Sequence, residues 1–217
     1  VILLAGHSSV KMSGNGLSTM KNNVGNFVGL LEKLSSLPYP PKLIYASSSS
    51  VYGDSKNKFV KEDDDKFVPN NFYDLSKHEI DLYATMYNSM GKLNVYGLRF
   101  GTVNGWSRNL RSDVMINAMF ASATETGEIN LFNPQVHRPI LGINDLCKAV
   151  ETILVYGTKQ NAGIYNLASF THTSEEIARK VSKALDARVM MRAPLLPKDA
   201  NFNTKLAAAC AADIHLR

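Results

Sequence analysis

The sequence predicts an α/β fold, a doubly wound parallel sheet with a small lobe built from C-terminal segments. Short apolar runs alternate along the chain with longer segments in which apolar residues recur at helical spacing. Strands that alternate with helices form a parallel sheet with helices on both faces. From about residue 102 onward the segments become shorter and the connections longer, which indicates a lobe made of insertions rather than an independent domain.

The chain opens on an apolar run, Val-Ile-Leu-Leu-Ala, at residues 1–5. Its length and its β-branched residues are typical of a strand that is buried on both faces of a sheet. The run is too short for the hydrophobic part of a secretory signal and has no positive segment before it. Because a protein rarely begins inside its central sheet, we interpret the chain as an internal fragment.

The later elements are expected from the same patterns. Apolar residues from Leu17 to Leu34 recur every three or four positions, and three prolines at 38, 40 and 41 end this helix. Thr173 and Glu176 have the spacing of a capping box that opens another helix. We expect strands over 43–46, 93–100, 128–132 and 164–167, and helices over 17–36, 72–90, 112–126, 144–156, 173–185 and 204–213.

Composition and charge narrow the class of protein. Hydrophobic residues make up 45% of the chain and charged residues 20%, as in an ordinary globular protein. The net charge of +5 suits small anionic ligands, but Lys and Arg are spread along the chain, which argues against a nucleic-acid partner. No apolar run of about 20 residues exists, so no membrane association is expected. Cys147 and Cys210 have no metal-ligand spacing, so we expect no metal site and a reducing, cytoplasmic compartment.

Tyr73 and Lys77 are the first candidates for chemistry. A spacing of four residues places both side chains on one face of the predicted helix. A lysine ammonium close to a tyrosine favours the phenolate and lowers the pKa of the phenol, so that the tyrosine can exchange a proton near neutral pH. The alternative is that the spacing arose by chance, because Tyr-x-x-x-Lys is a common pattern.

Four serines at 47–50 are the second candidate, followed by Val51, Tyr52 and Gly53. They come directly after an apolar strand, and ligands bind just beyond the carboxyl ends of strands in open parallel sheets. A serine hydroxyl there could contact both a substrate oxygen and the Tyr73 phenol. The alternative is a serine-rich turn that ends the strand.

Together, the serine run with its Val-Tyr-Gly and the Tyr-x-x-x-Lys some twenty residues later resemble the NAD-dependent epimerase/dehydratase family. This family belongs to the extended short-chain dehydrogenases/reductases, many of which modify nucleotide sugars. The resemblance implies a Rossmann-like sheet that is partial here, because its first βαβ units are missing. It also implies that residues 1–105 are the C-terminal part of the NAD(P)-binding domain with the catalytic Ser, Tyr and Lys, and that residues 106–217 are mainly a substrate-binding lobe interleaved with late Rossmann elements. Further segments resemble the family in the same order, at 1–7, 98–105, 138–145, 163–168 and 199–206.

The resemblance also implies roles for individual residues. Tyr73 would be the acid/base, Lys77 would hold the cofactor ribose and tune Tyr73, and Ser48 would be the catalytic hydroxyl. The cofactor would be bound by Ala5, Gly6, His7, Tyr73, Lys77, Thr102 and Val103. The substrate would be bound by Ser48, Ser49, Ser50, Thr102, Arg108, Arg111 and Arg138. Arg138 would grip the substrate diphosphate, and all three arginines have the planar fork that matches phosphate oxygens, although each could instead be a surface charge.

The positions after Ser48 distinguish the reactions of the family. Dehydratases typically carry an acidic pair there, and related decarboxylases usually keep a glutamate, whereas this chain has Ser49 and Ser50. Serine is no acid or base near neutral pH without help. The resemblance therefore implies a sugar-nucleotide 4-epimerase that oxidises its substrate transiently to a keto-sugar. The alternatives are a reductase, dehydrogenase or dehydratase of the same family, and, from another class, a non-catalytic binding or scaffold member or an inactive gene fragment.

Several departures from the family bear on the cofactor. Gly6 stands where a second alanine is common, and the loop after Thr102 differs from that of the best-known galactose epimerases. The Gly-x-x-Gly-x-x-Gly turn and the residue that selects NAD or NADP belong upstream of residue 1. We expect NAD as cofactor with NADP as the alternative, a nucleotide-diphosphate sugar as substrate, and a homodimer of the full-length protein through helices 17–36 and 72–90. The 217-residue chain by itself is expected to fold and to bind cofactor poorly.

Overall fold

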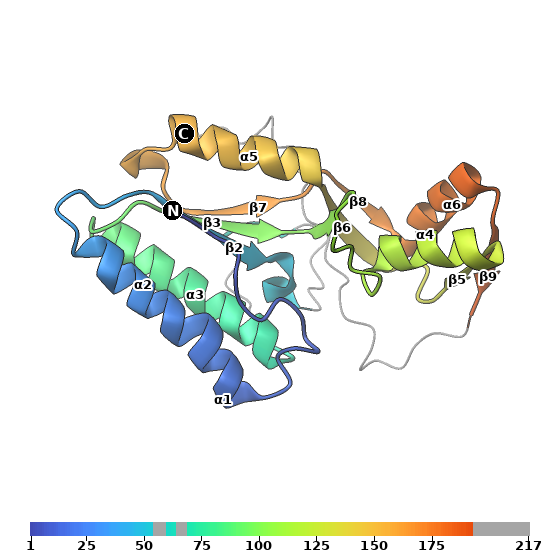
Figure 1. The fold of residues 1–217 in the computed structure, drawn as a ribbon, viewed down its shortest axis with the longest axis horizontal. Coiled ribbons are helices and arrows are strands. Elements are labelled where there is room, and N and C mark those ends of the chain that lie inside the picture. Colours follow the sequence, from blue (N-terminus) through green and yellow to red (C-terminus); the bar gives the residue numbers. More distant parts are fainter. Residues whose placement is uncertain (54–59, 64–68, 193–217) are drawn as a thin grey trace.

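The computed structural model describes residues 1–53, 60–63 and 69–192. A four-stranded parallel sheet in the order β1-β2-β3-β7 forms its centre. Figure 1 shows helices on both faces of this sheet, so the predicted α/β fold with a parallel sheet is confirmed. The strands of this sheet are β1 (Ile2–Leu3), β2 (Leu43–Ser48), β3 (Val95–Phe100) and β7 (Ile164–Leu167). One face is covered by α1 (Gly16–Thr19), the π-helix η1 (Met20–Gly25), α2 (Asn26–Ser35) and α3 (Phe72–Ser89). The other face is covered by α5 (Ile143–Tyr156).

Strand β2 shows how the sheet is buried. Leu43 and Tyr45 belong to the core cluster that contains residues of α2 and α3, whereas Ile44 belongs to the cluster that contains residues of α5. All three are 0–1% exposed. Successive side chains of a strand point to opposite faces, so a continuous apolar run is what a sheet covered on both sides requires.

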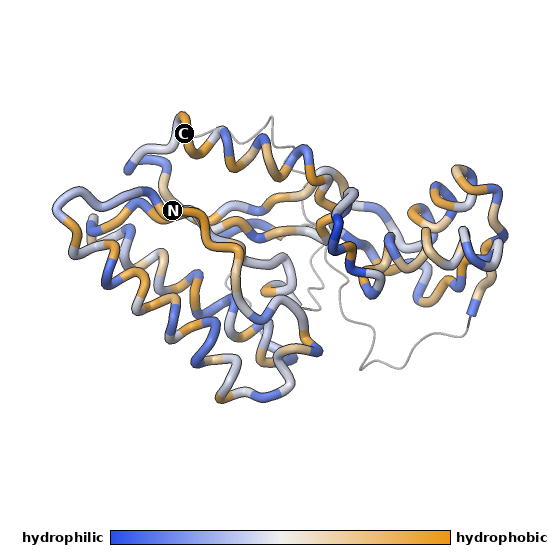
Figure 2. The backbone as a smooth tube through the Cα atoms, in the orientation of Figure 1, coloured by the Kyte–Doolittle hydropathy of each residue, from blue (hydrophilic) through white to orange (hydrophobic). Residues whose placement is uncertain are grey.

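The apolar run at 1–5 departs from its prediction. Its strand β1 contains only two residues and pairs along one edge, with β2. Val1, Ile2 and Leu4 are 46–59% exposed. Figure 2 shows this segment as a hydrophobic stretch next to the N-terminal end. The expectation of burial on both faces is therefore wrong for the part of the chain that the structure describes.

Besides the expected strand at 128–131, the C-terminal half contains strands that the sequence did not reveal. A three-stranded sheet in the order β4-β6-β8 and a parallel pair of β5 and β9 lie beyond the central sheet. Apolar residues of α4, α6, β5 and β9 share one core cluster. The bounds are β4 (Thr102–Asn104), α4 (Met115–Thr126), β5 (Glu128–Leu131), β6 (His137–Gly142), the 3-10 helix η3 (Lys159–Asn161), β8 (Phe170–Thr173), α6 (Ser174–Leu185) and β9 (Arg188–Met191). The capping box is present, because Thr173 and Glu176 each accept a hydrogen bond from the other's backbone N–H.

Gly101 lies where the chain passes from the central sheet to the second one. It separates β3 from β4, and its N–H donates to the Leu167 carbonyl. A Cβ atom at this position would lie 2.9 Å from the Pro139 carbonyl oxygen, so the residue has to lack one for β6 to approach so closely.

No helix among the described residues is long and apolar enough to cross a membrane. The helix expected over 204–213, the family-like segment 199–206 and Cys210 lie outside the described residues.

Candidate active site

A cavity of about 560 Å³ lies at the carboxyl ends of β1, β2 and β3, between the two sheets. This is the place where open α/β sheets bind their ligands, and the volume is in the range of small-molecule sites. The cavity is lined by Ala5, Gly6, His7, Ser48, Ser49, Tyr73, Lys77, Thr102, Val103, Arg111 and Arg138 among others. The structure thus brings most of the predicted site residues together around one cavity.

Ser48 is the last residue of β2 and the N-cap of η2 (Ser49–Tyr52). Its Oγ accepts a hydrogen bond from the Ser50 backbone N–H at 3.2 Å and donates to the Ser50 Oγ at 2.9 Å. The backbone turns directly after the strand, and Ser48 lines the cavity. The serine run therefore acts as a turn and also places Ser48 in the site.

Tyr73 lies in the first turn of α3, whose N-cap is Asn71. The pKa of Tyr73 is raised above its ordinary value, chiefly because the phenol is buried. The hydrogen bond with Ser48 and the charge of Arg111 lower this pKa, and the charge of Asp74 raises it. The prediction of a lowered pKa is therefore wrong, because burial outweighs the favourable contacts.

Lys77 lies one helical turn beyond Tyr73, with its Nζ 5.8 Å from the centre of the Tyr73 ring. The side chain is buried, and Nζ donates to the Ala46 carbonyl at 2.8 Å. Burial lowers the pKa of Lys77 to about 8, although the charge of Asp81 raises it. Only one of the three ammonium hydrogens is needed for Ala46, so Lys77 can donate to a ligand in the cavity.

Known proteins resemble this chain in sequence. The model of the "NAD dependent epimerase/dehydratase family" matches residues 1–168. The chain belongs to this family. UDP-glucuronate 4-epimerase 4 of Arabidopsis thaliana is 36% identical over 110 residues, which are 50% of this chain and 25% of that protein. ADP-L-glycero-D-manno-heptose-6-epimerase of Brachyspira hyodysenteriae is 37% identical over 106 residues, 48% of this chain and 32% of the relative. The chain thus matches about a quarter to a third of the length of these epimerases.

Solved structures of the family share the fold. UDP-N-acetylglucosamine 4-epimerase from Methanobrevibacter ruminantium M1 superimposes with a TM-score of 0.83 at 20% identity, over 100% of this chain and 70% of that one. The ADP-L-glycero-D-manno-heptose-6-epimerase of Helicobacter pylori gives a TM-score of 0.80 at 25% identity, over 98% of this chain and 64% of that one. The predicted NAD cofactor agrees with the family's NAD dependence.

The loop after β1 contains a residue that the sequence analysis missed. Asn23, in the π-helix η1, accepts a hydrogen bond from the His7 N–H at 2.8 Å and donates to the His7 carbonyl and to the Ser76 hydroxyl. Asn23 therefore ties the loop that lines the cavity to α3. The adjacent Asn22 and Asn23 interrupt an apolar helical pattern and could have pointed to this contact. A polar side chain on the buried face of a helix needs hydrogen-bond partners.

Gly6 stands in this loop with a φ of +140°, and a Cβ there would lie 2.9 Å from the Asn23 Oδ1. We expect Gly6→Ala to destabilise the protein by about 1–3 kcal/mol, because non-glycine residues are strained at this φ. Thermal unfolding measures the loss. Gly29→Ala is the matched control: Gly29 lies in α2 with nothing within 4 Å of an added Cβ, so this change is expected to stabilise the helix by about 0.5–1 kcal/mol. Equal stabilities of the two variants would contradict the assigned strain.

Two predicted site residues lie elsewhere. Ser50 is 1% exposed and Arg108 is exposed, and neither lines the cavity. Arg111 lines the cavity and also forms an ion pair with Asp113, with 2.7 Å between Nη2 and Oδ2. On the rim of the cavity Trp106 is 82% exposed. The roles of all these residues stay predictions.

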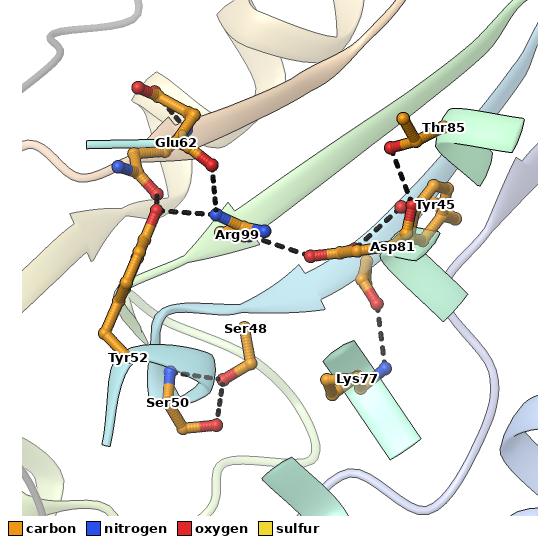
Figure 3. Close-up of polar contacts among 11 residues, drawn as sticks. Tyr45, Ser48, Ser50, Tyr52, Glu62, Lys77, Asp81, Thr85 and Arg99 are labelled. Carbon is orange, nitrogen blue, oxygen red and sulfur yellow. Dashed lines mark hydrogen bonds and ion pairs between the residues drawn. The ribbon is translucent and has the colours of Figure 1, made fainter. Parts of the chain in front are cut away.

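A buried ionic network lies beneath Lys77 (Figure 3). Asp81, one turn further along α3, accepts from the Tyr45 hydroxyl at 2.7 Å and from the Arg99 Nε at 2.8 Å. Arg99 also donates to the Tyr52 hydroxyl at 2.7 Å. Because Asp81 raises the pKa of Lys77, this network supports the charged form of the lysine.

Proposed function

We propose that the protein is an NAD-dependent sugar-nucleotide epimerase in which Tyr73 is the acid/base. The observation that carries the proposal is the gathering of Ser48, Tyr73 and Lys77 around one cavity, with serines at the two positions after Ser48. The relatives named as epimerases of UDP-glucuronate and ADP-heptose support the same class of substrate.

Each of the three residues has a distinct task in this reaction. A nicotinamide cofactor held by Lys77, Thr102 and Val103 would supply the hydride acceptor and donor for the sugar carbon. Tyr73 takes the proton of the sugar hydroxyl and gives it back. Lys77 binds the cofactor ribose with its free ammonium hydrogens, and its positive charge favours the phenolate. Ser48 hydrogen-bonds both Tyr73 and the reacting sugar oxygen.

The substrate diphosphate is assigned to the arginines on the cavity wall. Arg111 and Arg138 line the cavity, and a guanidinium group can bind two phosphate oxygens at once. The net charge of +5 also favours an anionic ligand. The homodimer stays a prediction, which the exposed apolar side chains of Leu82, Met86 and Met90 on and after α3 support.

The assay uses the natural gene product with a panel of UDP-, GDP- and dTDP-sugars. We expect one pair of 4-epimers to interconvert without net change in NADH, because the hydride leaves and returns to the same sugar carbon. Chromatography of the products and absorbance of NADH measure the two quantities. Net formation or consumption of NADH would indicate a dehydrogenase or reductase instead, and no turnover of any sugar nucleotide would favour a non-catalytic family member.

A further inference from the structure

Exposed apolar side chains line the cavity at its mouth. Trp106, Leu110 and Val10 are lining residues, and they are 82%, 51% and 41% exposed. We call these three residues the apolar rim. A single apolar side chain in solvent is ordinary, but several that share one concave site indicate a place where a ligand binds.

The backbone at Trp106 is fixed by the glycine before it. Gly105 has a φ of +153°, a conformation that other residues rarely adopt. An added Cβ at Gly105 would lie 2.6 Å from the Ile143 Cγ2, so the loop after β4 packs directly against the first residue of α5. The exposed indole therefore extends from a defined position on the cavity wall.

Arg111 connects the apolar rim to the interior of the cavity. It directly follows Leu110, and its Nη1 donates at 3.4 Å to the carbonyl of Ser8, two residues before Val10. This bond joins the loop after β4 to the loop after β1. The positive charge of Arg111 also lowers the pKa of Tyr73. One guanidinium thus adjoins both the candidate acid/base and the apolar side chains at the mouth.

We infer that Trp106 stacks on the base of a bound nucleotide and that the apolar rim is the base subsite. This inference rests on the proposed function, in which the sugar reacts at Tyr73 and the diphosphate is bound by Arg111 and Arg138. A nucleotide sugar carries its sugar, its diphosphate and its nucleoside in a row. With the sugar at Tyr73 and the diphosphate on the arginines, the base reaches the mouth of the cavity, where Trp106 is located.

An indole suits a base for physical reasons. A nucleobase is flat and aromatic, so it gains from stacking on a tryptophan whichever hydrogen-bonding groups it carries. A base in this place also covers part of the apolar surface of Leu110 and Val10 that otherwise faces water. The apolar rim is therefore expected to add affinity for uracil, thymine and guanine nucleotides alike.

The test measures binding to the natural gene product without turnover. UDP, GDP, dTDP and inorganic pyrophosphate are titrated calorimetrically into the wild type and into Trp106→Ala. We expect the substitution to weaken the nucleotide that the wild type binds most tightly by about 5- to 100-fold, the usual contribution of one stacked base. The affinities for pyrophosphate and for NAD are expected to stay unchanged. Trp106→Phe keeps an aromatic face and is expected to recover most of the loss.

Tyr39→Ala is the matched control, because Tyr39 is 92% exposed and does not line the cavity. Its nucleotide affinity is expected to equal that of the wild type. Since the Trp106 side chain is largely in solvent, Trp106→Ala is also expected to keep the wild-type Tm, which thermal unfolding checks.

Three results would overturn the inference: nucleotide affinity that survives Trp106→Ala, an equal loss for pyrophosphate, or a loss confined to NAD. Nucleotide binding that depends on Trp106 in a protein that epimerises no sugar nucleotide would contradict the proposed function alone.

Discussion

Tyr73→Phe is expected to lower kcat for epimerisation by about 10²- to 10⁴-fold, the usual contribution of a positioned acid/base group. The substitution removes only the phenol oxygen, which hydrogen-bonds Ser48, and keeps the ring that packs near Lys77. Cofactor affinity is expected to stay close to that of the wild type, because the lysine ammonium remains. Initial rates with the active sugar nucleotide and a titration with NAD measure the two effects.

Tyr83→Phe is the control for this substitution. It removes a phenol oxygen from the same helix, on the side that packs against the core cluster of α2 and β2. We expect its kcat to match that of the wild type. A Tyr73→Phe variant with wild-type kcat would mean that another group moves the proton, and the assignment of Tyr73 would then be wrong.

Arg99→Met is expected to cost about 3–5 kcal/mol of stability, the usual effect of removing one partner from a buried ion pair. Arg99 and Asp81 have side chains that are 9% and 3% exposed, with 2.8 Å between Nε and Oδ2. Without the guanidinium, Asp81 keeps a charge whose remaining partner in the network is the Tyr45 hydroxyl, and Tyr52 loses its donor. Chemical denaturation measures the free energy of unfolding.

An exposed ion pair provides the matched control. On α6, the Arg179 Nη2 lies 2.6 Å from the Glu175 Oε1, and the Arg179 side chain is 73% exposed. Because solvent screens such a pair, Arg179→Met is expected to cost less than about 1 kcal/mol. If Arg99→Met cost no more than this, the central network would contribute no more than a surface contact. Asp81→Asn combined with Arg99→Met is expected to recover part of the loss, since no buried charge is then left unpaired.

Local patterns were sufficient for the central sheet. The strands at 43–46 and 164–167 and the helix over 72–90 were predicted because their apolar residues repeat with a clear period and face a core on both sides of the sheet. The serine run and Tyr73 were found by the same route, since the end of a buried strand and the first turn of a helix are positions that sequence alone can locate.

The second sheet could not be predicted in this way. Strand β6 contains Pro139, which removes a backbone donor, and β8 is the polar sequence Phe-Thr-His-Thr, with every residue only half-buried. The two strands pair antiparallel, with Arg138 opposite His172, across more than thirty residues of chain. Such pairing depends on tertiary contacts, and no local signal in either segment announces it.

Dependence on tertiary contacts also explains why the buried carboxylates near the site were not predicted. Neither Asp74 nor Asp81 stood out in the sequence, yet both are buried. The partner of Asp81, Arg99, comes from the end of another strand, β3. A burial that depends on a distant strand is absent from the sequence pattern, and the lowered pKa expected for Tyr73 failed because the extent of its burial was likewise hidden.

Trp106 has one practical consequence for anyone who works with this protein. It is the only tryptophan of the chain, and it stands largely in solvent at the rim of the cavity. The indole fluorescence of this chain therefore originates at the mouth of the cavity. Ligand titrations can be read from unlabelled protein, and the emission needs no correction for indoles elsewhere in the fold.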